Sequence, residues 1–323
     1  MPSTKIEFAH ETINPLVGCS RISPGCKHCY AVPMAHRLGS NPATPQYAGA
    51  THMTPHGLDW TGEVRWVSGV LEKALVRLAR SKTSKRLFHC SMSDLCHEKS
   101  NADLLARVLA FAAALPQHKH IIITKRPYLL EQHILGLPSM PNIWDGARRP
   151  LFDACNVASR ERFKANRNSP AGLTLLQKAE YIGAIAAYAR FPLSNVMLMA
   201  TVEDRPRLEE RGPHMRRLAA LGWHTGLIFE PLLECVNLEP HLYYNDPSDG
   251  CALARNDWTP WIVVGHEQGP GARLMSTSIS GDVIAQACRA GAPVFFKKDS
   301  HGGHDPDRQP RHFPAWMLVE GEV

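Results

Sequence analysis

Residues 18–30 read GCSRISPGCKHCY and place Cys19, Cys26 and Cys29 within eleven residues. The spacing is C-x6-C-x2-C, and the Gly and Pro residues between the cysteines favour turns that can bring the thiols together. Thiolates are soft ligands that select zinc, copper(I) or iron-sulfur clusters. The segment therefore predicts a metal centre near the start of the chain, and the sequence that follows indicates which fold carries it.

Three thiolates leave one ligand position open, and the chemistry depends on what fills it. A structural zinc site needs a fourth protein ligand, for which His28, His36, Cys90 and Cys96 are candidates. A 4Fe-4S cluster can instead use three cysteines and keep one iron free for a small molecule. The spacing favours the iron-sulfur cluster and leaves two alternatives open, zinc and thiols that bind no metal. Nine cysteines, an odd number without an export signal, argue against a disulfide scaffold.

Downstream of the cysteines, short apolar runs alternate with amphipathic helical patterns. Continuous apolar runs suit the strands of a parallel sheet, which are buried on both faces. The alternation predicts repeated β-α units in an α/β fold, either a doubly wound open sheet or a complete or partial (βα) barrel. After a first strand at 6–8 or 13–17, the expected strands are 87–91, 120–124, 196–202, 227–229, 261–264 and 294–296, and the expected helices include 70–79, 103–115 and 282–290.

Length and composition predict one globular domain over residues 1–323. The chain is 44% hydrophobic and 20% charged, which excludes disordered, collagen-like and coiled-coil proteins. Without a long apolar run or a secretory start, we expect a cytoplasmic protein that does not contact a membrane. The net charge of +6 permits an anionic substrate without requiring one. Residues 130–190 lack a strand pattern and predict an insertion, residues 41–59 predict a long loop, and the tail after Lys298 predicts an extension over the surface.

Polar residues follow each predicted strand, where the loops of an α/β fold converge on one crevice. Carboxylates and cations at these places can bind the charged and hydroxyl groups of a ligand. Structural alternatives are a buried Glu230 before Pro231, an Arg126–Glu203 pair across neighbouring strands and a solvated Lys125. The candidate ligand-binding residues are Asp94, Lys125, Arg126, Glu203, Glu230, Glu267 and Arg273.

Two resemblances give these observations a common interpretation. Three cysteines after a first strand and before a series of β-α units resemble the radical S-adenosylmethionine enzymes, although the usual spacing there is C-x3-C-x2-C. More closely, eight ordered motifs look like those of the phage gene-product-37/gene-product-68 family, which is regarded as radical-SAM-like. They are NPLVGC at 14–19, SPGCKHCY at 23–30, SMSDL at 91–95, TKRP at 124–127, TVE at 201–203, FEPLL at 229–233, WIVVG at 261–265 and PVFFKK at 293–298.

The resemblance implies a partial (βα) barrel of about six parallel strands. It implies that Cys19, Cys26 and Cys29 hold a 4Fe-4S cluster, and that the seven strand-end candidates contact S-adenosylmethionine. It further implies a 5′-deoxyadenosyl radical that abstracts hydrogen from a small-molecule or nucleotide-like substrate, with an external electron donor. The chain reads GHEQG at 265–269 and KKDS at 297–300, where the family tends to have GGESG and KQWG, which indicates a different substrate.

Two other classes of function stay open. The +6 charge, the basic run at 160–167 and the phage-associated family favour a zinc-bound protein that processes or binds nucleic acid. In that run only Phe163 supplies an aromatic ring for base stacking. A non-catalytic iron-sulfur sensor is the second alternative. Metal analysis separates zinc from iron, and release of 5′-deoxyadenosine separates an enzyme from a sensor.

Overall fold

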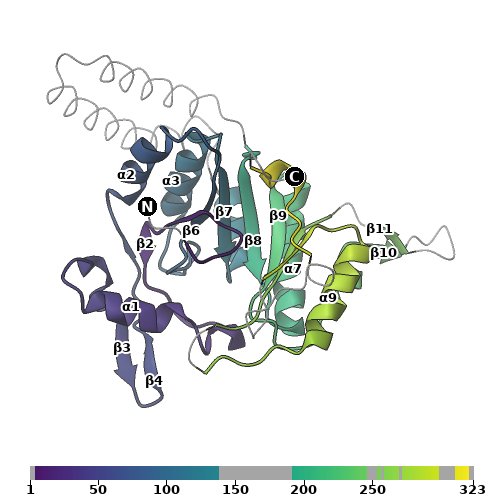
Figure 1. The fold of residues 1–323 in the computed structure, drawn as a ribbon, viewed down its shortest axis with the longest axis horizontal. Coiled ribbons are helices and arrows are strands. Elements are labelled where there is room, and N and C mark those ends of the chain that lie inside the picture. Colours follow the sequence, from purple (N-terminus) through teal and green to yellow (C-terminus); the bar gives the residue numbers. More distant parts are fainter. Residues whose placement is uncertain are drawn as a thin grey trace.

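The structure is a computed structural model that describes residues 4–137, 191–245, 253–255, 258–268, 271–297 and 310–319. Seven strands form its main sheet, and every neighbouring pair in that sheet is parallel. Each strand comes later in the sequence than the neighbour before it, so the order never reverses (Figure 1). In spatial order the strands are β1 (Glu11–Ile13), β6 (Arg86–His89), β7 (Lys119–Thr124), β8 (Val196–Thr201), β9 (His224–Phe229), β12 (Trp261–Val264) and β13 (Val294–Phe296).

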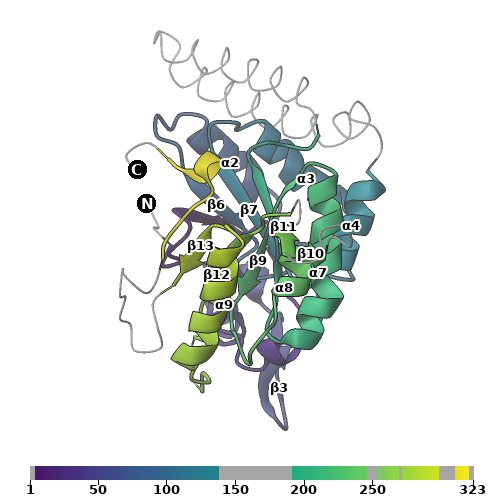
Figure 2. The ribbon, with the colours of Figure 1, turned by 90° about the vertical axis from the view of Figure 1, so that its right-hand side faces the viewer.

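This order places the connecting helices on one face of the sheet. Crossovers between parallel strands are right-handed, so successive crossovers in one direction put every helix on the same side. Figure 2 shows α3, α4, α7 and α9 around the outside of the sheet. The architecture is therefore a partial (βα) barrel and not a doubly wound sheet, which confirms the predicted fold class with seven strands. The helices are α2 (Val70–Leu78), α3 (Ala102–Ala113), α4 (Pro127–Leu135), α7 (Arg205–Ala220) and α9 (Thr277–Arg289).

The predicted strands and helices match the structure closely, apart from the first strand. Strands β12 and β13 have the predicted bounds, and the other four predicted strands differ at their ends by one to three residues. The first strand, β1, overlaps the predicted range 13–17 only at Ile13, because residues 6–8 precede it and Leu16–Val17 instead form β2, which pairs with β5 (Arg65–Trp66). Helix α9 begins five residues before the predicted helix, after the cap residue Ser276.

Side chains along each strand alternate between two cores. In β12, Ile262 and Val264 face the helices and belong to the large outer cluster. Trp261 and Val263 of the same strand belong to a second cluster inside the barrel. Successive side chains of a strand point to opposite faces, so both faces of this sheet are buried.

The amino end of the barrel interior is filled by segments from both ends of the chain. Phe8 precedes β1, and its ring packs against Phe88 with the ring centroids 5.9 Å apart. Met317, in the short 3-10 helix η3 (Ala315–Met317), is fully buried in the same inner cluster. The prediction that the tail only covers the surface is therefore wrong for residues 310–319, because their apolar side chains complete the barrel core.

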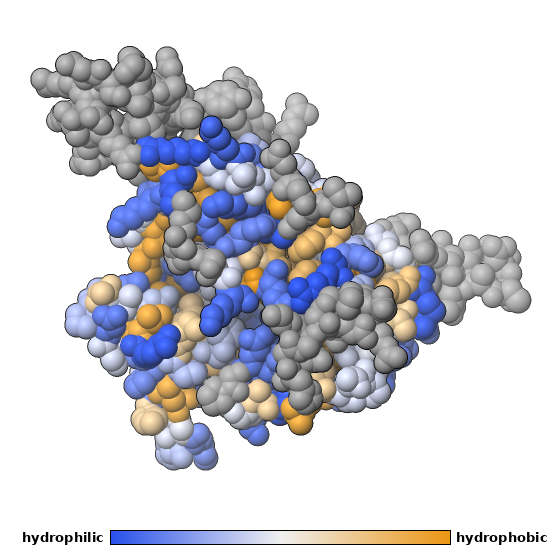
Figure 3. All heavy atoms as spheres, viewed as in Figure 1, coloured by the Kyte–Doolittle hydropathy of each residue, from blue (hydrophilic) through white to orange (hydrophobic). Residues whose placement is uncertain are grey.

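The segment after the cysteines contains more structure than the predicted loop at 41–59. Helix α1 (Ala31–Gly39) is followed by the 3-10 helix η2 (Pro45–Tyr47) and by an antiparallel hairpin of β3 (Thr51–Thr54) and β4 (Gly57–Trp60). The loop prediction is therefore wrong at its C-terminal end. Met34 of α1 and Met53 of β3 are exposed. Figure 3 shows hydrophobic residues interspersed with hydrophilic ones over α1 and this hairpin.

The remaining elements are short. The 3-10 helix η1 (Pro24–Cys26) lies in the cysteine segment, and α8 (Glu239–Leu242) precedes a small hairpin of β10 (Tyr243–Asn245) and β11 (Leu253–Arg255). Most of the predicted insertion at 130–190 lies outside the described residues, which end at 137 and resume at 191, so the insertion stays a prediction. In the described chain, no helix combines the length and apolar character that a membrane crossing requires.

Candidate functional site

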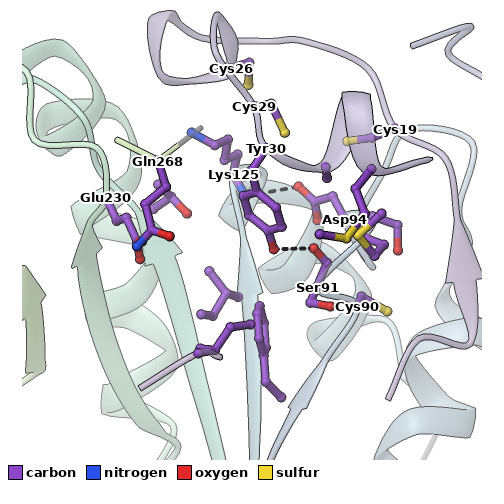
Figure 4. Close-up of a pocket in the computed structure, with 18 of the residues that line it drawn as sticks. Cys19, Cys26, Cys29, Tyr30, Cys90, Ser91, Asp94, Lys125, Glu230 and Gln268 are labelled. Atoms are coloured by element: carbon purple, nitrogen blue, oxygen red, sulfur yellow. Dashed lines mark hydrogen bonds between the residues drawn. The ribbon is translucent and has the colours of Figure 1, made fainter. Parts of the chain in front are cut away.

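A cavity of about 680 Å³ opens at the carboxyl ends of the barrel strands. Cys19, Cys26 and Cys29 line it from residues 18–30, which we call the cysteine loop (Figure 4). Five of the seven predicted ligand-binding residues also line it: Asp94, Lys125, Arg126, Glu230 and Glu267. The other two, Glu203 and Arg273, contact the cysteine loop from outside the cavity lining. The fold thus brings all ten predicted site residues to one end of the barrel.

The alternation of the strands explains why these charges meet. Ile123 of β7 faces the barrel interior, and Lys125 is two residues beyond it. The same step leads from Ile228 to Glu230 after β9 and from Phe295 to Lys297 after β13. Since the side-chain period of a strand is two residues, each of these charged groups continues the inward row of its strand.

The cysteine loop has a compact fold of its own. The backbone N–H of Cys26 donates to Ser23 O at 2.9 Å, which closes the turn of η1. The Arg21 guanidinium donates to Cys26 O and to Asp59 Oδ1, both at 2.6 Å, and so ties the loop to β4. Gly18 has φ of 95°, and a Cβ there would lie 1.9 Å from the Glu63 carbonyl oxygen. Only glycine fits at the start of this loop.

Glu203 fixes the centre of the cysteine loop to the barrel. Its fully buried carboxylate accepts hydrogen bonds from the Ser23 hydroxyl, the Lys125 ammonium and, at 3.0 Å, the Arg211 guanidinium. Gly25 lies directly against this carboxylate, because a Cβ there would be 2.3 Å from Glu203 Cγ. Burial acts to raise the pKa of Glu203, but the two cations hold it below its ordinary value.

Arg126 holds the beginning of the loop. It donates to Asp94 Oδ2 at 3.0 Å and to Ser20 Oγ at 2.8 Å, next to Cys19. Asp94 in turn accepts a hydrogen bond from the Thr124 hydroxyl at 2.7 Å. The structural alternative of an Arg126–Glu203 pair is not found. Arg126 pairs with Asp94 at 3.0 Å and with Glu98 at 2.7 Å, and Lys125 pairs with Glu203.

Arg273 holds the same loop from the far side of the barrel. Its guanidinium donates to Pro24 O at 3.0 Å and pairs with Glu267, with Nε 2.8 Å from Oε2. Lys125, Arg126 and Arg273 are therefore each paired with a carboxylate. These charges position the thiols as well as facing the cavity.

The surroundings give the three thiols different acidities. Burial and the nearby Asp94 carboxylate raise the pKa of Cys19 to about 12, and burial also raises the pKa of Cys29. Burial alone would raise the pKa of Cys26 too, but the Lys125 ammonium and local hydrogen bonds lower it. The thiolates of Cys26 and Cys29 raise the pKa of Cys19, and that of Cys26 raises the pKa of Cys29, so the three sulfurs are electrostatic neighbours.

The side chains around the three thiols bear on whether the loop suits a single zinc ion or a 4Fe-4S cluster. Among the described residues, no group of three or more His, Cys, Asp or Glu side chains can hold a single metal ion. A closed zinc site needs four donors around one ion. Of the candidate fourth ligands, His28 and Cys90 line the cavity with the three thiols. The candidate fourth ligand Cys96 is buried in the outer core. In a 4Fe-4S cluster each cysteine binds a different iron, and three thiols beside an open cavity fit that arrangement.

Lys297 also lines the cavity, although it is not among the seven predicted ligand-binding residues. Its ammonium pairs with the Glu230 carboxylate, and it lies 5.8 Å from the centroid of the Phe8 ring. Gly265 leaves room for the pair, since a Cβ there would lie 3.1 Å from Lys297 Cδ. The signal was present in the sequence, because Lys297 follows the inward-facing Phe295 at the strand period.

Comparison with solved structures found spore photoproduct lyase. The complex of this lyase with dinucleoside spore photoproduct is 13% identical with a TM-score of 0.45, and the match covers 92% of this chain and 79% of that chain. A cysteine-to-serine mutant of the same lyase is 11% identical with a TM-score of 0.42 at the same coverage. A variant with bound AdoMet and dinucleoside spore photoproduct is 12% identical with a TM-score of 0.39, covering 88% of this chain and 62% of that chain.

Comparison of the sequence with curated proteins found no match. A family model, described as "Protein of unknown function (DUF5131)", matches residues 3–315. That match spans nearly all of the 323 residues, including the cysteine loop and all seven barrel strands. The chain therefore belongs to the DUF5131 family.

Proposed function

We propose that this chain is a radical S-adenosylmethionine enzyme in which Cys19, Cys26 and Cys29 hold a 4Fe-4S cluster. One observation carries the proposal: three thiols of one loop line a single large cavity at the carboxyl end of a parallel partial barrel. With S-adenosylmethionine, such a cluster supplies a 5′-deoxyadenosyl radical that abstracts hydrogen from a substrate. The phage-family resemblance, the external electron donor and the cytoplasmic location stay predictions from sequence.

The charged residues of the cavity suit a zwitterionic ligand. The Arg126 guanidinium lies between two carboxylates, Asp94 and Glu98, and Arg273 pairs with Glu267. The methionyl group of S-adenosylmethionine carries both an ammonium and a carboxylate, so it adds no net charge next to such pairs. We assign Asp94, Lys125, Arg126 and Glu267 as its contacts. We assign Glu203 and Arg273 as positioning residues, which hold Ser23 and Pro24 and thereby the thiols.

Metal analysis tests the cluster. The chain is purified without oxygen, reconstituted with iron and sulfide, and analysed for iron, sulfide and zinc. We expect iron and sulfide in the native chain and a loss of both in each of C19A, C26A and C29A. Cys288 is exposed on α9, so C288A is the matched control and keeps its iron. Zinc without iron, or equal iron in all four variants, contradicts the proposal.

Turnover is tested separately on the iron-loaded protein. S-adenosylmethionine and a strong reductant are added, and 5′-deoxyadenosine is quantified by chromatography. We expect release from the native chain and none from C26A. A loaded cluster that releases no 5′-deoxyadenosine would support the non-catalytic sensor instead.

A further inference from the structure

Tyr30 places a fixed aromatic surface inside the cavity. Its hydroxyl donates to the Ser91 carbonyl oxygen at 2.6 Å, which holds the ring in one orientation. The side chain is 40% exposed although it lines the cavity, and burial raises the pKa of its phenol. Figure 4 shows the ring between Glu230 and Gln268 on one side and Asp94 and Ser91 on the other. The exposed surface of the ring therefore faces the cavity.

Glu230 offers a hydrogen-bond acceptor on one side of this ring. Its side chain is 22% exposed, whereas the side chain of its partner Lys297 is only 6% exposed. The carboxylate is thus the accessible member of the pair, and the ammonium behind it neutralises its charge. A neutralised acceptor binds the N–H or O–H of an uncharged group and gives no advantage to an anion.

The floor of the cavity is apolar and partly aromatic. Phe8 and Phe88 line it, together with Ile123 and Ile228. Such a floor accommodates the face or edge of an aromatic ring. These four apolar side chains offer no partner to the hydroxyls of a sugar or to the oxygens of a carboxylate or phosphate, whereas a flat ring can bury its face against them.

We propose that this part of the cavity binds the base of a nucleoside, which makes the substrate of the proposed reaction a nucleobase derivative. The inference rests on the proposed function for its role as substrate site, but its residues do not include the cysteines. A flat heterocycle with N–H donors matches the three features together: stacking on Tyr30, hydrogen bonding to Glu230 and contact with the apolar floor.

Nucleoside binding is measured by calorimetry on the full chain, without reductant and with saturating S-adenosylhomocysteine. The probes are thymidine, deoxycytidine and deoxyguanosine, with ribose 5-phosphate as the comparison. We expect at least one nucleoside to bind while ribose 5-phosphate does not. If no nucleoside binds, if S-adenosylhomocysteine displaces every nucleoside, or if ribose 5-phosphate binds equally well, the inference is overturned.

Variants test the assigned surface. Loss of one stacking partner typically weakens base binding by about tenfold or more, so Y30A should raise the nucleoside Kd by that factor. Y30F keeps the ring and should bind within a few-fold of the native chain. Tyr128 has the same 40% exposure but lies on α4, so Y128A is the matched control. An unchanged Kd in Y30A, or a loss in Y30F as large as in Y30A, overturns the stacking role.

The experiment separates this inference from the proposed function. Binding needs neither electrons nor turnover, so a chain that binds nucleosides through Tyr30 but contains no iron would overturn the radical mechanism alone. A chain that releases 5′-deoxyadenosine but binds no nucleoside would overturn the substrate assignment alone.

Discussion

The interior of this barrel is filled at one end and hollow at the other, although the same seven strands build both ends. At the amino end, Phe8, Trp261 and Met317 pack against one another in the inner cluster. At the carboxyl end, the same inward rows continue with Lys125, Glu230 and other charged groups. Charged side chains need partners, so they pair with each other and with the cysteine loop and leave space between them. Where the inward side chains of a strand change from apolar to charged, the packed core ends and the cavity begins.

The ion pairs at the two ends also differ in burial. Near the amino end, the side chains of Glu7 and Arg311 are 16% and 33% exposed. At the carboxyl end, those of Glu203 and Arg211 are 0% and 1% exposed. Removing one partner of a buried pair leaves an uncompensated charge, whereas an exposed charge is solvated by water. The difference in burial can therefore be tested by measuring how much the loss of each carboxylate lowers the free energy of unfolding.

The largest effect is expected at Glu203. E203Q leaves the buried Arg211 and the half-buried Lys125 without their carboxylate, which should lower the free energy of unfolding by about 3–5 kcal/mol. The measurement is the urea unfolding curve followed by circular dichroism. The iron content of the reconstituted variant should fall as well, because the loop loses its contact at Ser23.

The control lies at the amino end. E7Q removes the carboxylate from a partly exposed pair and should cost under about 1 kcal/mol with unchanged iron content. If E7Q and E203Q unfold at the same urea concentration, the loss of a carboxylate costs the same at both ends, and the difference in burial has no effect on stability.

A second, smaller effect is expected at Gly25. G25A places a methyl group where Glu203 lies 2.3 Å away, and three hydrogen bonds prevent that carboxylate from moving. Overpacking of this kind should cost up to about 3 kcal/mol and displace the cysteine loop. Thermal unfolding and iron content measure the two consequences.

Gly281 in α9 is the matched control for this substitution. Nothing lies within 4 Å of a Cβ built at Gly281, so G281A should leave iron binding unchanged and stabilise the helix by up to about 1 kcal/mol. A G25A variant as stable and as rich in iron as G281A would show that the loop does not need close contact with Glu203.

A third prediction extends the comparison to the outer face. His89 and His120 are fully buried there, with Nε2 of one 2.9 Å from Nδ1 of the other. Burial lowers the pKa of His89 to about 3 and that of His120 well below its ordinary value. The unfolded chain binds protons below pH 6.5 and the folded chain does not, so stability falls as the pH drops from 6.5 towards 3. At pH 5 each histidine should cost about 2 kcal/mol.

Urea unfolding at pH 7 and pH 5 measures this loss. The double variant H89L/H120L should lose less stability on acidification than the native chain. H52L, at an exposed position in β3, should keep the native pH dependence. Equal acid sensitivity in all three chains would place the responsible groups elsewhere, at the carboxylates of the two barrel ends.

Sequence periodicity predicted the parts of the fold that repeat. The runs at 261–264 and 294–296 are apolar throughout because both faces of those strands are buried, and this is a local signal. The hairpin at Thr51–Trp60 was missed because its Thr, His, Pro and Gly residues resemble those of a loop. The burial of Met317 was missed because it depends on distant strands, which a local pattern does not report.

In the candidate site, too, the local pattern predicted some features, whereas others depend on distant residues. The sequence predicted that polar residues at the strand ends would meet at one site. The structure brings the seven charged candidates to one end of the barrel, next to the cysteine loop. The sequence did not predict partners, because which carboxylate meets Arg126 depends on the spacing between neighbouring strands and on the path of the cysteine loop. Lys297 would have been found by extending the inward row of Phe295 by one step.

The way the cysteine loop is held has a consequence for the biosynthesis of the protein. Its thiols are within the first thirty residues, but its anchors are Arg126, Glu203 and finally Arg273. A chain emerges from the ribosome starting at its N-terminus, so the three cysteines are made long before the groups that position them. The loop would therefore reach its ordered arrangement only after Arg273 has been synthesised.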